Sequence, residues 1–171
     1  MKRAASVFLR ADITASDAYA LIDWLKNKKI TKYMNESPKV TENIHTILKQ
    51  GNTPFLTMYF NRQGRFFMID DDKNLPIGFI KLVETEVENS YEIVIAIGDE
   101  SIWGRGYGRN AVNKCLQMVF YEWRADKIIA NIHYENRHSI NLFEKMGLKK
   151  EKENRNTIRY RITKEEYLKR A

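Results

Sequence analysis

The chain has 171 residues, of which 43% are hydrophobic and 30% are charged, and its formal net charge is +7. These proportions exclude a long disordered chain. The sequence contains no run of 18 apolar residues that would mark a transmembrane helix, and residues 1–12 lack the apolar centre of a signal peptide. We therefore expect one globular domain, residues 1–171, in the cytoplasm, where the single cysteine would stay reduced, and the positive charge favours an anionic partner.

The first 50 residues predict one strand followed by helices. An alternating apolar pattern over Val7–Ile13 predicts the strand, and Thr14 or Ser16 can cap the helix that follows. A second helix is predicted over Thr41–Gln50, with its first residue as the N-cap and Gly51 as its end. The segment Lys32–Pro38 lies between them and has the composition of a turn. It is either an acceptor-binding loop or an ordinary connection.

The middle of the chain predicts an antiparallel meander. Its strands cover Arg65–Asp70, Pro76–Val87 and Tyr91–Ile97, and polar turns join them. The pattern of Phe55–Phe60, just before the meander, is ambiguous.

Three glutamates in the second strand of the meander are spaced two residues apart. Because side chains alternate along a strand, Glu84, Glu86 and Glu88 would share one face. This acidic face would either receive a cationic amine or belong to a solvated hairpin.

The last third predicts a long helix, a strand, a short helix and two final strands. The long helix covers Tyr107–Trp123, and the strand covers Lys127–Tyr134 with Tyr134 on its apolar face. The short helix covers Asn136–Lys145, and Leu148–Tyr167 would add a strand, a turn and a strand.

Cys115 lies in the apolar face of the long helix. A catalytic thiol needs access and a lowered pKa, and no histidine is evident nearby in the sequence. We therefore interpret Cys115 as a packed core residue.

Ser90–Trp123 combines an apolar strand, a glycine-rich turn and an amphipathic helix. Gly104, Gly106 and Gly108 let a ligand approach the backbone closely. The helix that follows presents unpaired N–H groups and the positive end of its dipole. This arrangement predicts a site for a phosphate or pyrophosphate.

Two nucleotide-binding alternatives are weaker. Gly106–Ala111 matches the fingerprint G-x-G-x-x-A of dinucleotide-binding domains, but the roughly 60 residues that remain do not supply the strand-helix-strand units that such a domain needs. No Gly-Lys-Ser/Thr follows the glycines, so a Walker-type nucleotide hydrolase is not expected.

Two motifs resemble signatures of the GNAT acetyltransferase superfamily. Trp103–Gly108, with the sequence WGRGYG, resembles its acyl-CoA-binding loop R/Q-x-x-G-x-G/A; Gly106 and Gly108 match this pattern and Trp103 does not. Asn136–Leu148, with the sequence NRHSINLFEKMGL, resembles the second signature of the branch that includes the ribosomal-protein N-terminal acetyltransferases. Two such motifs in order are far more specific than either alone.

The resemblance implies an α+β fold, with a mixed, largely antiparallel sheet flanked by helices on both faces, which is the GNAT acyl-CoA N-acyltransferase fold. In that fold a bulge parts two strands of the sheet, and the pantetheine arm of acetyl-CoA fills the gap. The implied activity is the transfer of the acetyl group of acetyl-CoA to a primary amine, on a protein N-terminus or a small molecule, by direct attack in a ternary complex. The implied cofactor-binding residues are Ile95, Ala96, Ile97, Trp103, Gly104, Arg105, Gly106, Tyr107, Gly108, Arg109, Asn110, Asn136, Ser139 and Asn141.

The resemblance also implies two roles in proton transfer. Glu92 matches a glutamate common in this branch and would act as the general base. Phe143 occupies the position where many GNAT enzymes have a tyrosine, so Ser139 would act as the acid in its place. Three alternatives stay open: Glu92 as a solvated carboxylate, Ser139 as a helix cap, and Tyr134 as a weaker candidate acid.

Two other classes of function also stay open. One is a non-catalytic acyl-CoA-binding or regulatory module. The other is a basic nucleic-acid-binding protein, for which the mixed-charge run Lys149–Arg161 is only weak support. We expect no membrane partner and no metal, because the three histidines lack a metal-binding spacing. A homodimer would be compatible with the sequence.

Overall fold

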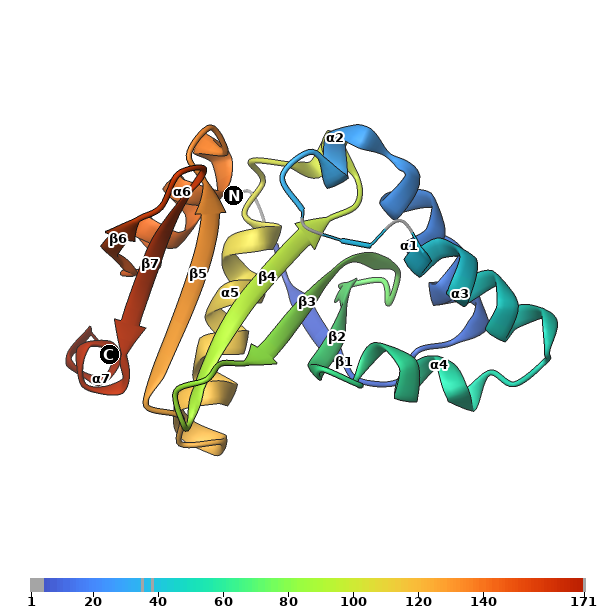
Figure 1. The fold of residues 1–171 in the computed structure, drawn as a ribbon, viewed down its shortest axis with the longest axis horizontal. Coiled ribbons are helices and arrows are strands. Elements are labelled where there is room, and N and C mark those ends of the chain that lie inside the picture. The colour runs from blue at the N-terminus through green and yellow to red at the C-terminus, as the bar shows by residue number, and fades with distance from the viewer. Residues whose placement is uncertain (1–4, 35, 38, 171) are drawn as a thin grey trace.

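The computed structural model describes residues 5–34, 36–37 and 39–170. A seven-stranded sheet forms its centre, with helices on both faces, which confirms the expected fold class (Figure 1). The strands are β1 (Val7–Arg10), β2 (Gly64–Asp71), β3 (Pro76–Glu84), β4 (Ser90–Ile97), β5 (Lys127–His133), β6 (Lys149–Glu153) and β7 (Thr157–Thr163). The helices are α1 (Ala15–Lys26), α2 (Lys28–Thr31), α3 (Lys39–Lys49), α4 (Pro54–Phe60), α5 (Tyr107–Gln117), α6 (Arg137–Lys145) and α7 (Lys164–Arg170), with a short 3₁₀ turn η1 (Glu100–Ile102) and a π-helical turn η2 (Met118–Glu122).

The strands follow the spatial order β1-β2-β3-β4-β5-β7-β6. β4 and β5 run parallel, whereas all other neighbouring strands run antiparallel. The predicted meander is therefore confirmed as β2, β3 and β4. A parallel pair needs a crossover connection, and α5 provides it between β4 and β5 (Figure 1).

Side-chain alternation divides the sheet into two faces, which we name the α5 face and the α1 face after the helices that cover them. On the α5 face, Ile80 and Ile93 belong to one core together with Leu116 of α5. On the α1 face, Phe79 belongs to a second core together with Leu21 of α1. The helices of the first third of the chain thus lie opposite α5.

Local signals locate the ends of the first helices with one error. Thr14 caps α1 as predicted, because its hydroxyl accepts a hydrogen bond from the amide of Asp17 in a capping box. Gly51 follows the end of α3 with a positive φ of 67°, as predicted. The prediction that Thr41 is the N-cap of α3 is wrong, because the helix already begins at Lys39.

Arg10 joins β1, α1 and β2. Its guanidinium donates hydrogen bonds to both carboxyl oxygens of Asp17, at 2.6 and 3.0 Å, and to both of Asp70, at 2.7 and 2.9 Å. Burial of the Asp17 carboxyl opposes its ionisation, but the hydrogen bonds from Arg10 and Thr14 outweigh burial and lower its pKa. This ion pair fixes α1 against the edge of the sheet.

Two predictions, about the acidic hairpin and about the end of the last strand, are wrong. β3 ends at Glu84, so Glu86 and Glu88 lie in the turn to β4, where alternation no longer places side chains on one face. The strand, turn and strand predicted after Leu148 are confirmed as β6 and β7, but the last strand is shorter than predicted, because β7 ends at Thr163 and the chain continues as α7. Thr163 and Glu166 form a capping box there, a T-x-x-E signal that was available in the sequence.

The sequence predicts an apolar face on the long helix and another on β5, and the structure agrees with the two predictions to different degrees. Cys115 is fully buried, and burial raises the pKa of its thiol to about 12, which confirms it as a core residue. Tyr134 lies one residue beyond the end of β5 and is 49% exposed, so its predicted place on an apolar strand face is wrong. The ambiguous segment Phe55–Phe60 is helical and lies within α4.

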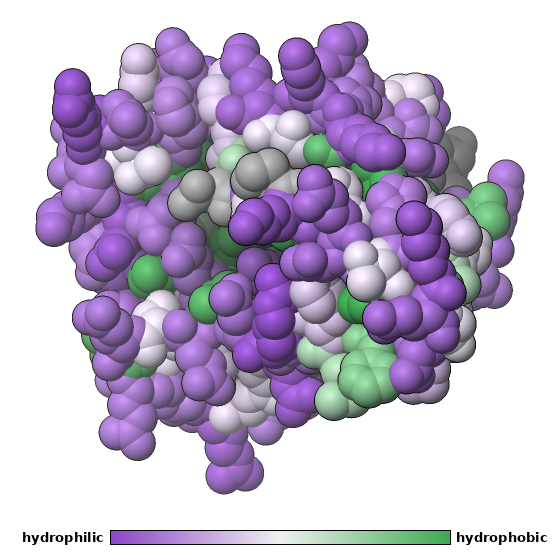
Figure 2. All heavy atoms as spheres, turned by 45° about the vertical axis from the view of Figure 1, so that its right-hand side comes forward, coloured by the Kyte–Doolittle hydropathy of each residue, from purple (hydrophilic) through white to green (hydrophobic). Residues whose placement is uncertain are grey.

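The surface gives few signs of a partner. Within the described part of the chain, none of the helices combines the length and the apolar character needed to cross a bilayer. Viewed from the side of α3 and α4, the molecule is mainly hydrophilic, and hydrophobic side chains appear in small groups (Figure 2). The homodimer stays a prediction.

Candidate active site

β4 and β5 pair at one end and part at the other. Their parallel register covers only Ser90–Glu92 on β4 and Lys127–Ile129 on β5. Beyond that point β4 continues along β3 as far as Ile97, and β5 continues along β7 as far as His133. The sheet therefore opens between two neighbouring strands, as the resemblance implies. We name this opening the β4–β5 gap.

The backbone of β4 offers hydrogen-bonding groups to this gap. The amide of Gly98 donates to Ile77 on the β3 side at 2.8 Å, and residues of an antiparallel strand alternate in the direction of their backbone groups. Ile95 and Ile97 therefore point their amides and carbonyls toward the gap, whereas the amide and carbonyl of Ala96 point toward β3. The role of these three residues in binding the cofactor stays a prediction.

The expected bulge is not seen in the pairing of β4 with β3. The described register of β3 with β4 is continuous from Glu84–Tyr91 to Gly78–Ile97. Residues 94–97 are nonetheless only partly buried, although β4 is the central strand of the sheet. The central strand of a covered sheet is normally buried on both faces, so this end of β4 is more accessible than its central position predicts.

The glycine-rich turn follows β4 and leads into α5. Gly106 is the N-cap of α5 with φ at 92°, and Gly104 has φ at 75°. A Cβ atom added to either glycine would meet no atom within 4 Å, so the space above this turn is open. Both positions thus require glycine for backbone conformation while leaving room for a ligand.

The backbone amides at this turn fall into two groups, those that donate a hydrogen bond to another described residue and those that do not. In the described part of the chain, the amides of residues 106–109 donate to no protein acceptor, which is the usual state of a helix N-terminus. The amide of Arg105 donates to Ile102 at 3.3 Å, and that of Asn110 donates to Gly106 at 3.0 Å. The predicted cradle from Arg105 to Asn110 is therefore shorter at both ends.

The side chains around the turn also differ in what they can bind. Arg105 and Arg109 are exposed, so their charges can reach an anion above the free amides. The side-chain amide of Asn110 instead donates to the carbonyl of Ala5. Asn110 thus holds the N-terminal segment, and both its backbone and its side-chain N–H groups are engaged within the protein.

Trp103 joins the turn to the end of the gap. Its indole N–H donates to the carbonyl of Ile97 at 2.9 Å, and its ring stacks on His138 of α6 with centroids 5.7 Å apart. The carbonyl of Ile97 is therefore already paired. Trp103 positions the turn between β4 and α6, and this packing explains a residue that departs from the usual motif.

Glu92 lies at the vertex of the gap. It is the last residue of β4 that pairs with β5, and it is half buried. Its partner in β3 is Val83, which is four residues after Phe79. Positions 79, 81 and 83 alternate onto one face of β3, so the Glu92 side chain is on the α1 face, like that of Phe79. The predicted base thus lies opposite α5, on the face that the first helices cover.

Ser139 lies on the other side of the gap, in the first turn of α6 beyond the end of β5. Its amide donates to the side-chain oxygen of Asn136 at 3.3 Å, and Asn136 is the N-cap. The alternative role of Ser139 as a helix cap is therefore wrong. Phe143 is buried in the core, and Asn141 is exposed on α6.

The segment between α2 and α3 crosses the site on the α1 face. Tyr33 stacks on His133 at the end of β5 with centroids 5.0 Å apart, and Glu36 pairs with Lys81 of β3 at 3.6 Å. Because β4 lies between β3 and β5, this segment passes over β4 (Figure 1). We name it the crossing segment; residues 35 and 38 of the predicted loop lie outside the described residues.

No local pattern in the sequence identifies these contacts. Tyr33 and Glu36 meet partners about 100 and 45 positions away, and only the fold brings them together. Trp24 is a similar case, since a Cβ atom on Gly98 would lie 2.2 Å from its ring. Gly98 therefore allows α1 to approach the end of β4.

Within the described residues, no three His, Cys, Asp or Glu side chains come together in a way that could hold a metal ion.

Comparison with known sequences identifies the family. A family model described as "Acetyltransferase (GNAT) domain" matches residues 7–149. Spermidine N(1)-acetyltransferase of Vibrio cholerae is 33% identical over 92 residues, which are 53% of this chain and 52% of that protein. Uncharacterized protein MJ1062 of Methanocaldococcus jannaschii is 28% identical over 152 residues, which are 84% of this chain and 28% of that protein. The matches thus span about half or less of the length of these curated relatives.

Solved structures share the fold. A domain from M. jannaschii superimposes with a TM-score of 0.73 at 25% identity, covering 93% of this chain and 99% of that one. Spermidine N-acetyltransferase from V. cholerae, in complex with CoA and spermine, superimposes with a TM-score of 0.76 at 23% identity, covering 95% of this chain and 98% of that one.

The relatives named above include no ribosomal-protein acetyltransferase, so that branch stays a prediction. The match to the family model covers most of the chain, and the glycine-rich turn and the β4–β5 gap agree with it. The chain therefore belongs to the GNAT acetyltransferase family, whose members use acetyl-CoA as the acetyl donor.

Proposed function

We propose that this protein transfers the acetyl group of acetyl-CoA to a primary amine, on a protein N-terminus or a small molecule, by direct attack in a ternary complex. One observation carries the proposal: the β4–β5 gap ends beside four amides at the N-terminus of α5 that donate to no acceptor among the described residues. A gap of this kind admits an extended arm, and the amides suit the anionic group at the end of that arm.

The donor side would be held as follows. The amides of residues 106–109 and the dipole of α5 bind the pyrophosphate, and the exposed Arg105 and Arg109 add positive charge. Asn136 and Asn141 hydrogen-bond the arm from the α6 side. The backbone amide of Ile95 faces the gap and donates to the thioester oxygen as negative charge develops on it.

Proton handling would fall to groups on the two sides of the gap. The amine nitrogen forms a bond to the thioester carbon, the carbon–sulfur bond breaks, and the nitrogen loses a proton. Glu92 accepts that proton directly or through a water molecule. Ser139 donates a proton to the departing thiolate, and Tyr134, which is exposed rather than packed, is the alternative donor.

Two measurements test this proposal. Acetyl-CoA should raise the melting temperature through linkage, and NADH should not. CoA should then be released when a panel of amines and short peptides is added. Stabilisation by NADH alone would favour a dinucleotide-binding protein, and stabilisation by acetyl-CoA without CoA release would identify a non-catalytic acyl-CoA-binding module.

A further inference from the structure

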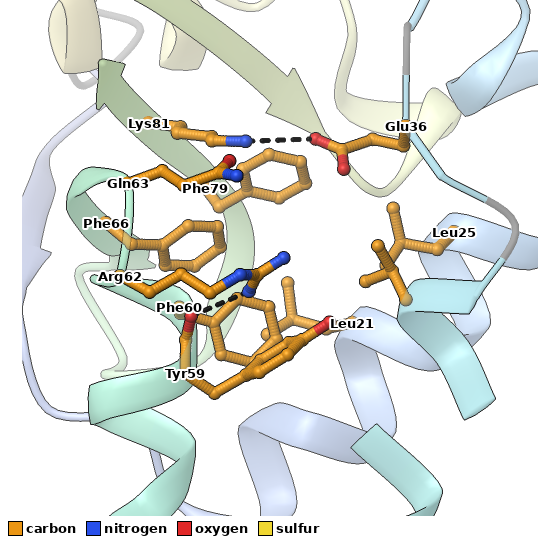
Figure 3. Close-up of a pocket in the computed structure, with 11 residues that line it drawn as sticks. Leu21, Leu25, Glu36, Tyr59, Phe60, Arg62, Gln63, Phe66, Phe79 and Lys81 are labelled. Carbon is orange, nitrogen blue, oxygen red and sulfur yellow. Dashed lines mark hydrogen bonds and ion pairs between the residues drawn. The ribbon is translucent and has the colours of Figure 1, made fainter. Parts of the chain in front are cut away.

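A narrow cavity opens on the α1 face beside β4, between β2 and β3 on one side and α1 and α3 on the other (Figure 3). Its volume of about 30 Å³ leaves room for roughly two water-sized groups. Six apolar side chains form its wall: Leu21, Leu25, Val40, Phe60, Phe66 and Phe79. Glu36, Tyr59, Arg62, Gln63 and Lys81 complete the lining, so the cavity combines an apolar wall that suits an aliphatic group with polar groups beside it.

The cavity is within reach of the β4–β5 gap. Phe79 and Lys81 line it from β3, and their partners in the register are Ala96 and Val94 of β4. Neighbouring strands lie about 4.8 Å apart, so the cavity is one strand away from the edge that faces the gap. Glu36 of the crossing segment also lines it. To reach the cavity, a substituent on an amine in the gap would pass over Val94 and Ala96 of β4, beneath that segment.

The charges at its mouth are mostly positive. Arg62 points its guanidinium into the cavity, where it lies 4.0 Å from the centre of the Tyr59 ring and donates to the Tyr59 carbonyl at 2.7 Å (Figure 3). Lys81 and Glu36 pair across the opening at 3.6 Å. Two cations thus face one carboxylate, and a second ammonium group on the acceptor would be repelled.

We infer that this cavity binds a short apolar substituent of the acceptor, so that the substrate class is a monoamine with an alkyl group of about four to six carbons rather than a polyamine. The inference rests on the proposed acetyl transfer. A free alkylamine and a peptide whose first residue has an aliphatic side chain present the same chemistry to the cavity.

A series of amines tests the inference directly. From propylamine to pentylamine, kcat/KM should rise about fourfold for each methylene, which is the effect of burying one CH₂ group, because the last two carbons of the chain enter the cavity. 1,4-Diaminobutane has the same number of heavy atoms as pentylamine but ends in an ammonium group, so its kcat/KM should be at least about tenfold lower. Tripeptides that begin with Gly, Ala, Val or Leu and are otherwise identical distinguish a peptide source from a free amine.

Variants of the cavity provide the structural control. Leu25→Phe narrows the cavity from its partly buried wall and should lower the ratio of kcat/KM for pentylamine over propylamine at least about tenfold. Leu75→Phe makes the same change in the exposed turn between β2 and β3 and should leave the ratio unchanged. Arg62→Glu, at an exposed position, should bring 1,4-diaminobutane about fivefold closer to pentylamine.

A binding measurement complements turnover. With CoA present, pentylamine should raise the melting temperature of the protein more than 1,4-diaminobutane does, and Leu25→Phe should remove the difference. Preferred acetylation of 1,4-diaminobutane or spermidine, or rates independent of chain length, would overturn the inference and leave acetyl transfer intact. Failure of every amine and peptide to release CoA would overturn both.

Discussion

The two faces of β4 are built in different ways. On the side of α5, one stretch of chain from Ile95 to Arg109 supplies the free strand edge, the glycine-rich turn and the helix N-terminus. On the α1 face, the groups that lie over β4 come from β3, from the crossing segment and from the end of β5. The first side is continuous in sequence, whereas the second is assembled from distant segments.

This difference separates the two substrates. Substitutions on the α1 face can alter the acceptor without touching the amides that would hold acetyl-CoA. Lys81, Arg62 and Glu36, for example, are all remote from the turn at Gly106. Acceptor choice is therefore expected to vary among proteins that keep the same donor site, and each substitution below should affect one side more than the other.

The largest effect is expected at the donor side. Gly106→Val would place a side chain in the open space above the free amides and strain a φ of 92°, so acetyl-CoA affinity should fall at least about a thousandfold. The measurement is the shift in melting temperature with acetyl-CoA. Gly51→Val imposes similar strain at a φ of 67° after α3, also in open space, and should keep the shift. Unaltered affinity in Gly106→Val would remove this turn from the donor site.

The next largest effect is expected on stability, at the Arg10–Asp17 ion pair that fixes α1 to the sheet. Asp17→Asn removes one of the two carboxylates that pair with the partly buried Arg10 and should lower the free energy of unfolding by about 2 kcal/mol. Denaturant titration measures this, and Asp12→Asn at a nearby exposed position is the control.

The pH dependence of that ion pair has a definite sign. The pKa of Asp17 is lower in the folded protein than its ordinary value of 3.8, so the unfolded chain takes up this proton first as the pH falls. The stabilisation is complete above that value and is lost as the pH falls through the folded pKa. Asp17→Asn should therefore weaken the acid dependence of stability below about pH 4. An unchanged acid dependence would contradict this assignment.

At the α1 face, Glu92→Gln should lower kcat about a hundredfold, because a general base typically contributes at least that much. Acetyl-CoA affinity should stay within about twofold, since Glu92 lies on the face opposite α5. Glu84→Gln makes the same change at an exposed position at the end of β3 and should be silent. A steady-state assay with saturating acetyl-CoA distinguishes the two, and full activity in Glu92→Gln would exclude it as the base.

The smallest effect is expected at α6. Ser139→Ala should lower kcat about tenfold and affect acetyl-CoA affinity less, if its hydroxyl protonates the leaving thiolate. Ser16→Ala at an exposed position of α1 is the matched control. Wild-type rates in Ser139→Ala would exclude Ser139 as the proton donor and favour Tyr134, and Tyr134→Phe would then test that alternative.

The accuracy of the sequence-based predictions follows the range of the interactions involved. Thr14 and Gly51 were located correctly because a cap or a left-handed residue acts within one helical turn. Glu86 was placed wrongly because the end of β3 depends on how the turn to β4 closes, through the bond from the Thr85 amide to Ser90. The capping box at Thr163 was a local signal and could have been used.

The sequence by itself determined the grouping that we propose as the donor site, because glycines, a strand and a helix N-terminus that follow one another must lie together in space. Only the tertiary structure decided the arrangement that we propose as the acceptor side. The pairing of Glu36 with Lys81, the stacking of Tyr33 on His133, and the cavity beside them all join residues separated by whole elements. Such contacts depend on how the two cores pack on the sheet, and no periodicity or spacing along the chain encodes that packing in a form that can be read locally.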